Sequence, residues 1–70
     1  MLKEQDKKII LALADNSMQV KPTARQLYLH WNTVYYRIDR IWDETGLNPR
    51  NFYDLNKLVE MVKKEKEDGR

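Results

Sequence analysis

The chain has 70 residues, two glycines, two prolines, no cysteine and a formal net charge of +2. A chain of this length holds one small core, and without cysteine neither disulfides nor thiolate-bound metal can add to its stability. Its longest apolar run, residues 9–14, is too short to cross a bilayer, and no signal peptide opens the sequence. With good helix formers throughout, the composition predicts an all-α domain, by default in the cytoplasm.

The first predicted helix covers residues 3–15, where apolar residues recur at spacings of three, four and seven with charges between them. Asn16 and Ser17 are turn formers. Met18 and Val20, which follow them, are expected to hold this connection against the core.

A short second helix is predicted over residues 22–28. Pro22 suits the first turn of a helix, where its missing N–H leaves no hydrogen bond unmade. Ala24, Leu27 and Tyr28 are expected to form its buried face.

Two further helices are predicted, over residues 31–45 and 52–64. A wheel centred on Ile38 directs Val34, Ile41, Trp42 and Thr45 to the core. Gly46 ends the third helix, because glycine accepts the left-handed conformation at little cost. Asn51 and Asp54 resemble a capping pair for the fourth helix. Residues 1–64 are therefore expected to form one domain, followed by a charged, disordered tail at 65–70.

The stretch KPTARQLYLHWNTVYYRIDRI, residues 21–41, has the spacing of a helix-turn-helix. Ala24 lies where the two helices must cross closely, and Leu29 is expected to hold the turn against the core. The glycine that this motif often carries in its turn is replaced by Tyr28. The surplus positive charge also lies in the middle of the chain, where only Asp39 opposes Lys21, Arg25, Arg37 and Arg40.

These residues resemble a known family. The order T-A-x-x-L-x-L-H-x-N-T-V-x-Y-R-I-x-x-I, followed by T-G-L, is similar to the C-terminal helix-turn-helix of the PucR and CdaR (sugar diacid regulator) transcription factors, which itself resembles the DNA-binding end of Fis. The resemblance runs from about Ile9 to Val62. Trp31 and Tyr35 depart from the family pattern, which often has Arg or Pro at the first position and a basic residue at the second.

The resemblance implies double-stranded DNA as the partner, with the helix at 31–45 in the major groove. On the wheel, Asn32, Thr33, Tyr36 and Arg40 lie opposite the core. Asn32 is expected to contact adenine, Thr33 a thymine methyl or a phosphate, and Tyr36 a phosphate or the groove wall. The full predicted DNA-binding set is Lys21, Thr23, His30, Trp31, Asn32, Thr33, Tyr35, Tyr36, Arg37 and Arg40.

Other roles are open for several of these residues. Tyr35 and Tyr36 also fit the edge of the core, and Trp31 the packing against the first turn. Arg37 also fits an ion pair with a carboxylate such as Asp15 or Glu44, and His30 fits a cap on the third helix. The rival function is a protein-interaction or dimerisation module that uses the surface of Trp31, Tyr35 and Tyr36.

Catalysis is not expected, since the chain has one histidine, no cysteine and no glycine-rich phosphate loop. No cofactor or metal is expected either. Helix-turn-helix proteins usually bind as dimers on two half-sites, so a homodimer on DNA is predicted. In the family that the chain resembles, dimerisation also comes from a larger sensory region before this domain. Whether the chain is an excised domain or a stand-alone regulator stays open.

Overall fold

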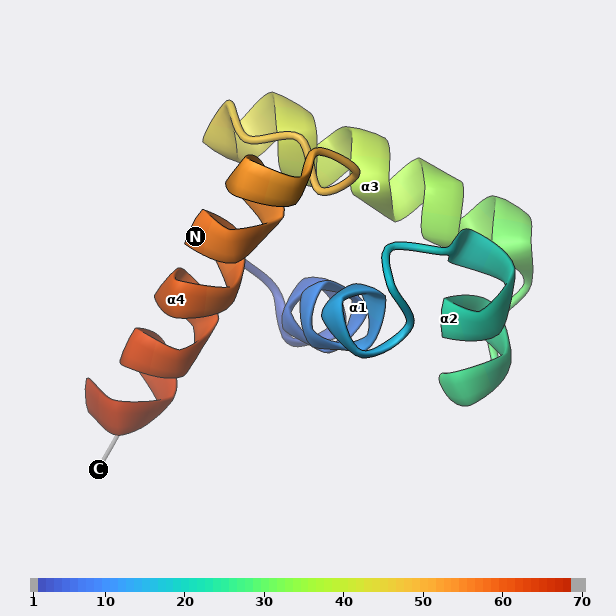
Figure 1. Cartoon of the computed structure of the whole chain (residues 1–70), viewed down its shortest axis with the longest axis horizontal. Helices are drawn as coiled ribbons and strands as arrows, with labels where there is room; N and C mark the ends of the chain where they lie inside the picture. Colours follow the sequence, from blue (N-terminus) through green and yellow to red (C-terminus); the bar gives the residue numbers. More distant parts are fainter. Residues whose placement is uncertain (1, 69–70) are drawn as a thin grey trace.

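The structure, a computed structural model, describes residues 2–68, with side chains as far as Glu65. Within these residues the helices are α1 (Glu4–Asp15), α2 (Val20–Gln26), α3 (Trp31–Thr45) and α4 (Phe52–Asp68). Figure 1 shows α1 nearly end-on in the centre, with α4 on its left, α2 on its right and α3 across the top. The prediction of an all-α, four-helix domain is confirmed.

The first helix is the centre of the packing, since α1 contacts each of the other three helices. Its Ile9, Ile10 and Leu13 are fully buried, at the spacing expected of an amphipathic stripe. Removing one such side chain from water contributes about 2 kcal/mol. The rest of the hydrophobic core comes from Leu2 and the other helices, through Val20, Ala24, Val34, Ile38, Ile41, Leu55, Leu58 and Val62.

The fourth helix is longer than predicted. It runs to Asp68, so the expected charged tail at 65–70 is helical as far as that residue, and residues 69–70 lie outside the described part. Lys7 Nζ of α1 lies 2.7 Å from Oε1 of Glu65, one residue beyond the predicted end. The hydrogen bond to Glu65 raises the pKa of Lys7 above its ordinary value, while desolvation acts in the opposite direction. This pair joins α4 to α1.

The second helix begins two residues earlier than predicted. Val20, expected in the connection, is buried in its first turn, and Met18 packs against the core as expected. The turn before α2 is tied to the end of that helix, because the Asn16 amide donates to Oε1 of Gln26 at 2.7 Å.

The turn between α2 and α3 contains the least favourable backbone conformation of the motif. Tyr28 has φ +58°, and its side chain is 96% exposed, so the prediction that it is buried is wrong. Its backbone takes the left-handed conformation for which helix-turn-helix motifs often use glycine. Ala24 is buried, and the N–H of Leu29 donates to the Ala24 carbonyl at 2.9 Å. Leu29 itself packs partly buried against the core, as expected.

The third helix ends as predicted. Gly46 has φ +74°, and its N–H donates to the Trp42 carbonyl at 2.8 Å. After it, the Asn51 side chain accepts the N–H of Asp54 at 3.1 Å, as the capping pair requires. The Asp54 carboxylate, however, accepts the N–H of Asn48 at 3.0 Å. These two hydrogen bonds therefore hold the connection to α4 at Asn48 and at the start of the helix.

Candidate nucleic-acid interface

The third helix is turned about its axis relative to the orientation predicted by the helical wheel. Val34, Ile38 and Ile41 are buried, but Trp42, which the wheel directs to the core, is 49% exposed. On the other side of Ile38, Arg37 faces inward because it pairs with Asp6 of α1. The wheel is wrong here because it assumes that only apolar side chains face the core.

Asn32, Tyr36 and Arg40 follow one another at intervals of four residues along α3. Side chains at this spacing lie one turn apart on the same side of a helix. All three are exposed, Tyr36 at 60%, whereas Thr33 is half-buried at the edge of this row. We refer to Asn32, Tyr36 and Arg40 as the α3 ridge. It offers an amide, a phenol and a guanidinium to one ligand.

The second half of α3 is acidic at its surface. Asp39, Asp43 and Glu44 are all exposed. A carboxylate oxygen of Glu44 lies 3.6 Å from Nη2 of Arg40, the one cation of the ridge. Since carboxylates repel phosphates, the first half of α3 is the part suited to contact a polyanion.

An aromatic row begins immediately before α3. His30 Nδ1 accepts the N–H of Asn32 at 3.0 Å, so His30 caps the helix, the other role that was open for it. Its ring centroid lies 5.2 Å from that of Trp31. Trp31 meets Tyr35 edge to face, with 6.1 Å between centroids. Trp31 is 43% and Tyr35 38% exposed, so the core covers only part of each ring.

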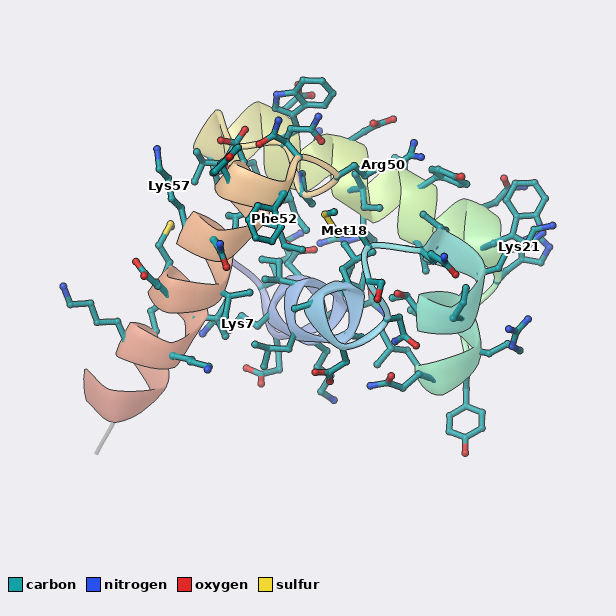
Figure 2. All side chains as sticks on the ribbon, in the orientation of Figure 1. Lys7, Met18, Lys21, Arg50, Phe52 and Lys57 are labelled. Carbon is teal, nitrogen blue, oxygen red and sulfur yellow. The ribbon has the colours of Figure 1, made fainter. Side chains whose placement is uncertain are left out.

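A hollow of about 320 Å³ lies between α2 and the start of α3, lined by Lys21, Ala24, Arg25, Leu29, His30 and Trp31. Lys21, a predicted contact residue, is therefore beside Trp31, and Figure 2 shows it near the start of α3. Arg25 shares the hollow although the predicted set did not include it. Its basic charge was the signal that could have added it.

Two predicted contact residues are instead engaged inside the protein. Arg37 Nε and Nη2 lie 2.9 and 2.7 Å from Oδ1 of Asp6, so the ion pair expected as an alternative exists, but with neither Asp15 nor Glu44. Thr23 is fully buried, and its hydroxyl donates to the Gln19 carbonyl at 2.7 Å. To reach DNA, each side chain would have to leave its internal partner.

Arg50 was missed by the sequence analysis. It lies in the connection between α3 and α4, and its guanidinium carbon is 5.3 Å from the ring centroid of Tyr35, fifteen residues earlier. A separation of this length along the chain carries no periodic signal, so only the tertiary structure could bring these two residues together.

In the part of the chain that the structure describes, no helix is both long and apolar enough to span a membrane. Nor do three His, Asp or Glu side chains there gather closely enough to hold a metal ion.

The chain matches the model of a known family. The model of the PucR C-terminal helix-turn-helix domain matches residues 8–59. This range includes all of α2 and α3, together with most of α1 and the first half of α4. No curated protein and no solved structure matches the chain significantly. Because the family match covers most of the sequence, the chain belongs to the family of PucR C-terminal helix-turn-helix domains, which are DNA-binding domains of transcription regulators.

Proposed function

We propose that this chain binds double-stranded DNA in a sequence-specific manner, as the output domain of a PucR- and CdaR-like transcription regulator. The observation that carries the proposal is the α3 ridge, with Asn32, Tyr36 and Arg40 exposed one turn apart on a helix whose other side is buried. At 1.5 Å per residue, the 15 residues of α3 span about 22 Å. A helix of this kind enters the major groove, which is about 12 Å wide.

Within the groove, Asn32 is the residue proposed to read sequence. A side-chain amide can donate to and accept from the major-groove edge of adenine at the same time. Asn32 lies in the first turn of α3, and its side chain is exposed while its backbone N–H is already held by His30. The backbone that carries its amide is therefore fixed at the end of the helix proposed to enter the groove.

Tyr36 and Arg40 are proposed to position the helix. A phenol and a guanidinium both donate to phosphate oxygens, and such contacts fix the register on the duplex without reading bases. Arg40 has Glu44 at 3.6 Å, with both side chains well exposed, and a surface pair of this kind contributes little. Arg40 can therefore exchange Glu44 for a phosphate at small cost.

A dimer is proposed as the unit that recognises an operator. The domain measures 31 × 23 × 19 Å, so its longest dimension is close to one turn of B-DNA, about 34 Å. One copy thus covers one half-site, and a pair on adjacent half-sites provides the affinity that a single copy lacks. The second copy joins through this domain or through a sensory region of a longer regulator. Binding to chromosomal DNA would place the protein in the cytoplasm.

The experiment begins with selection of preferred duplexes from a randomised pool by the 70-residue chain. Affinities of variants are then measured on the selected duplex and on single-base changes of it. Arg40→Ala is expected to weaken binding to all duplexes about equally. Asn32→Ala is expected to reduce discrimination at one base pair, by about 1–3 kcal/mol. Asn56→Ala, which removes an exposed amide from α4, is the control and is expected to change neither.

Two results would contradict the proposal. If Asn32→Ala and Arg40→Ala behave alike on every duplex, Asn32 does not read sequence. If the chain binds no duplex even at low salt, the proposal of DNA binding is wrong, and the result favours the rival function, a protein-docking surface of Trp31, Tyr35 and Tyr36.

A further inference from the structure

A continuous surface of aromatic and basic side chains runs along one flank of α3. The hollow beside α2 brings Lys21 and Arg25 to Trp31. Trp31 meets Tyr35 edge to face, and Arg50 covers the ring of Tyr35. Three segments of the chain, α2, α3 and the connection to α4, thus contribute to one row. We refer to Lys21, Arg25, Trp31, Tyr35 and Arg50 as the flanking row.

Arg50 is held in this row by its backbone as well as by Tyr35. Its N–H donates to the side-chain oxygen of Asn48 at 3.0 Å, and the preceding Pro49 is buried. The N–H of Asn51 donates to the Asn48 carbonyl at 2.9 Å. The turn that carries Arg50 is therefore closed on itself, and little conformational entropy remains to be lost when Arg50 binds a ligand.

The cations on the two flanks of α3 differ in their partners. Arg37 is paired with Asp6 and Arg40 with Glu44. Within residues 2–65, by contrast, Lys21, Arg25 and Arg50 make no ion pair with a carboxylate. Among the cations beside α3, those without a carboxylate partner therefore lie on the flanking row.

We propose that the flanking row binds one phosphodiester strand of the duplex, with Arg50 as a DNA-contacting residue held in place by Tyr35. This inference rests on the proposed function, because a helix in the major groove has a phosphodiester strand along each flank. A guanidinium over the face of an aromatic ring is attracted to the ring as a cation, which leaves its N–H donors for phosphate oxygens. Trp31 and Tyr35 offer apolar ring surface to the sugars between those phosphates.

The row also has a boundary. Asp39 is exposed one turn beyond Tyr35 on α3 and would repel a phosphate. The bound strand is therefore expected to run from Lys21 to Arg50 and to leave α3 before its C-terminal end. Figure 2 shows this spacing, with Lys21 near the start of α3 and Arg50 beside its middle.

The test measures the salt dependence of binding of the 70-residue chain to a fixed 20-base-pair duplex of mixed sequence. Arg50→Ala is compared with Lys57→Ala, which removes one positive charge from an exposed position of α4 on the far side of the molecule (Figure 2). Each phosphate contact contributes about 0.9 to the slope of log K against log salt concentration. Arg50→Ala is expected to lower that slope by about 1 and to weaken binding several-fold. Lys57→Ala is expected to leave both unchanged.

The role of Tyr35 is tested by a double-mutant cycle. Tyr35→Phe keeps the ring and is expected to behave like the parent chain. Tyr35→Leu removes the ring and is expected to weaken binding when Arg50 is present, but to have a much smaller effect when Arg50 is already alanine. Circular dichroism of each variant checks that the fold is retained. Equal effects of Tyr35→Leu in both backgrounds would overturn the holding role of Tyr35.

The outcomes separate this inference from the proposed function. If Arg50→Ala and Lys57→Ala are indistinguishable while Asn32→Ala still alters sequence preference, the flanking row does not bind the strand and the proposed function stands. If no variant on either surface changes DNA binding, both proposals are wrong. If Arg50→Ala abolishes the binding of a protein ligand but leaves the affinity for the duplex unchanged, the flanking row binds a protein partner.

Discussion

Asp6 and Arg37 are joined by two contacts to one carboxylate oxygen, with Nε and Nη2 of Arg37 at 2.9 and 2.7 Å from Oδ1 of Asp6. The Asp6 side chain is fully buried in the first turn of α1, and that of Arg37 is 15% exposed. A buried charge has to keep its partner, so this pair fixes the rotation of α3 about its axis relative to α1. That rotation turns Tyr36 outward and leaves Trp42 half-exposed.

Removing the carboxylate is expected to destabilise the domain strongly. Asp6→Ala leaves the Arg37 guanidinium largely buried without its partner, and loss of one member of a buried pair costs about 3 kcal/mol. The measurement is urea unfolding followed by circular dichroism. Lys7→Ala, which removes the neighbouring, more exposed pair with Glu65, is the control and is expected to change the unfolding midpoint much less. Similar midpoints for the two variants would show that the Asp6 pair does not hold the fold.

Replacing both charges separates stability from orientation. Asp6→Leu combined with Arg37→Leu is expected to recover much of the stability lost by Asp6→Ala, because an apolar pair avoids the desolvation of buried charges. Without the two contacts, α3 is free to rotate, and discrimination among the selected duplexes is expected to fall. A double variant with full stability and unchanged duplex preference would show that apolar packing alone orients α3.

The backbone at Tyr28 predicts a stabilising substitution. Tyr28→Gly relieves the left-handed conformation of a residue whose side chain is almost wholly exposed, and the expected gain is about 0.5–1 kcal/mol in the free energy of unfolding. Tyr28→Ala keeps the strain while removing the ring, so it is expected to leave stability nearly unchanged. Urea unfolding of both variants tests this, and a less stable glycine variant would mean that the tyrosine ring contributes to the fold.

Ala24 tests the close crossing of α2 and α3. Ala24→Leu places a larger side chain where the buried alanine packs, and overpacking of this kind costs about 1–3 kcal/mol. Ala14→Leu makes the same change at an exposed position of α1 and is the control, with little effect expected. Thermal unfolding compares the two variants. An Ala24 variant as stable as the control would show that the helices do not need a small residue at this crossing.

A substitution of Thr23 tests whether its buried hydroxyl contacts DNA. Thr23→Val keeps the shape of the side chain but loses the hydrogen bond to the Gln19 carbonyl, at an expected cost of about 1 kcal/mol. The salt dependence of duplex binding is expected to match that of the parent chain. If the slope falls by as much as for Arg40→Ala, the hydroxyl does reach a phosphate, and Thr23 contacts DNA as the sequence predicts.

The regular parts of the fold could be predicted because they depend on local patterns. Ile9, Ile10 and Leu13 lie on one stripe of a helix whatever it packs against, and Gly46 favours a left-handed turn wherever it follows a helix. Errors lie at the ends of elements. The fourth helix continues past Lys64 to Asp68, and Glu65 in this extension pairs with Lys7 of α1.

The candidate interface was predictable only in part. The residues of the α3 ridge follow from helical periodicity, since a side chain four residues from an exposed one is usually exposed as well. The inward orientation of Arg37 does not follow from periodicity, because its partner Asp6 is thirty-one residues away in the sequence. The position of Thr23 is similar, since a threonine in the first turns of a helix is equally suited to face solvent or a neighbouring helix.

By itself, the sequence determined four helices, the helix-turn-helix spacing and the family, because these depend on side-chain periodicity and on residue order within a few turns. Only the tertiary structure decided that Arg37 faces α1 and which cations beside α3 remain without a carboxylate partner. Those properties depend on contacts such as Asp6 with Arg37 and Arg50 with Tyr35. The physical reason is that charge pairing and cation–π contact act through space, between residues whose separation along the chain has no regular period.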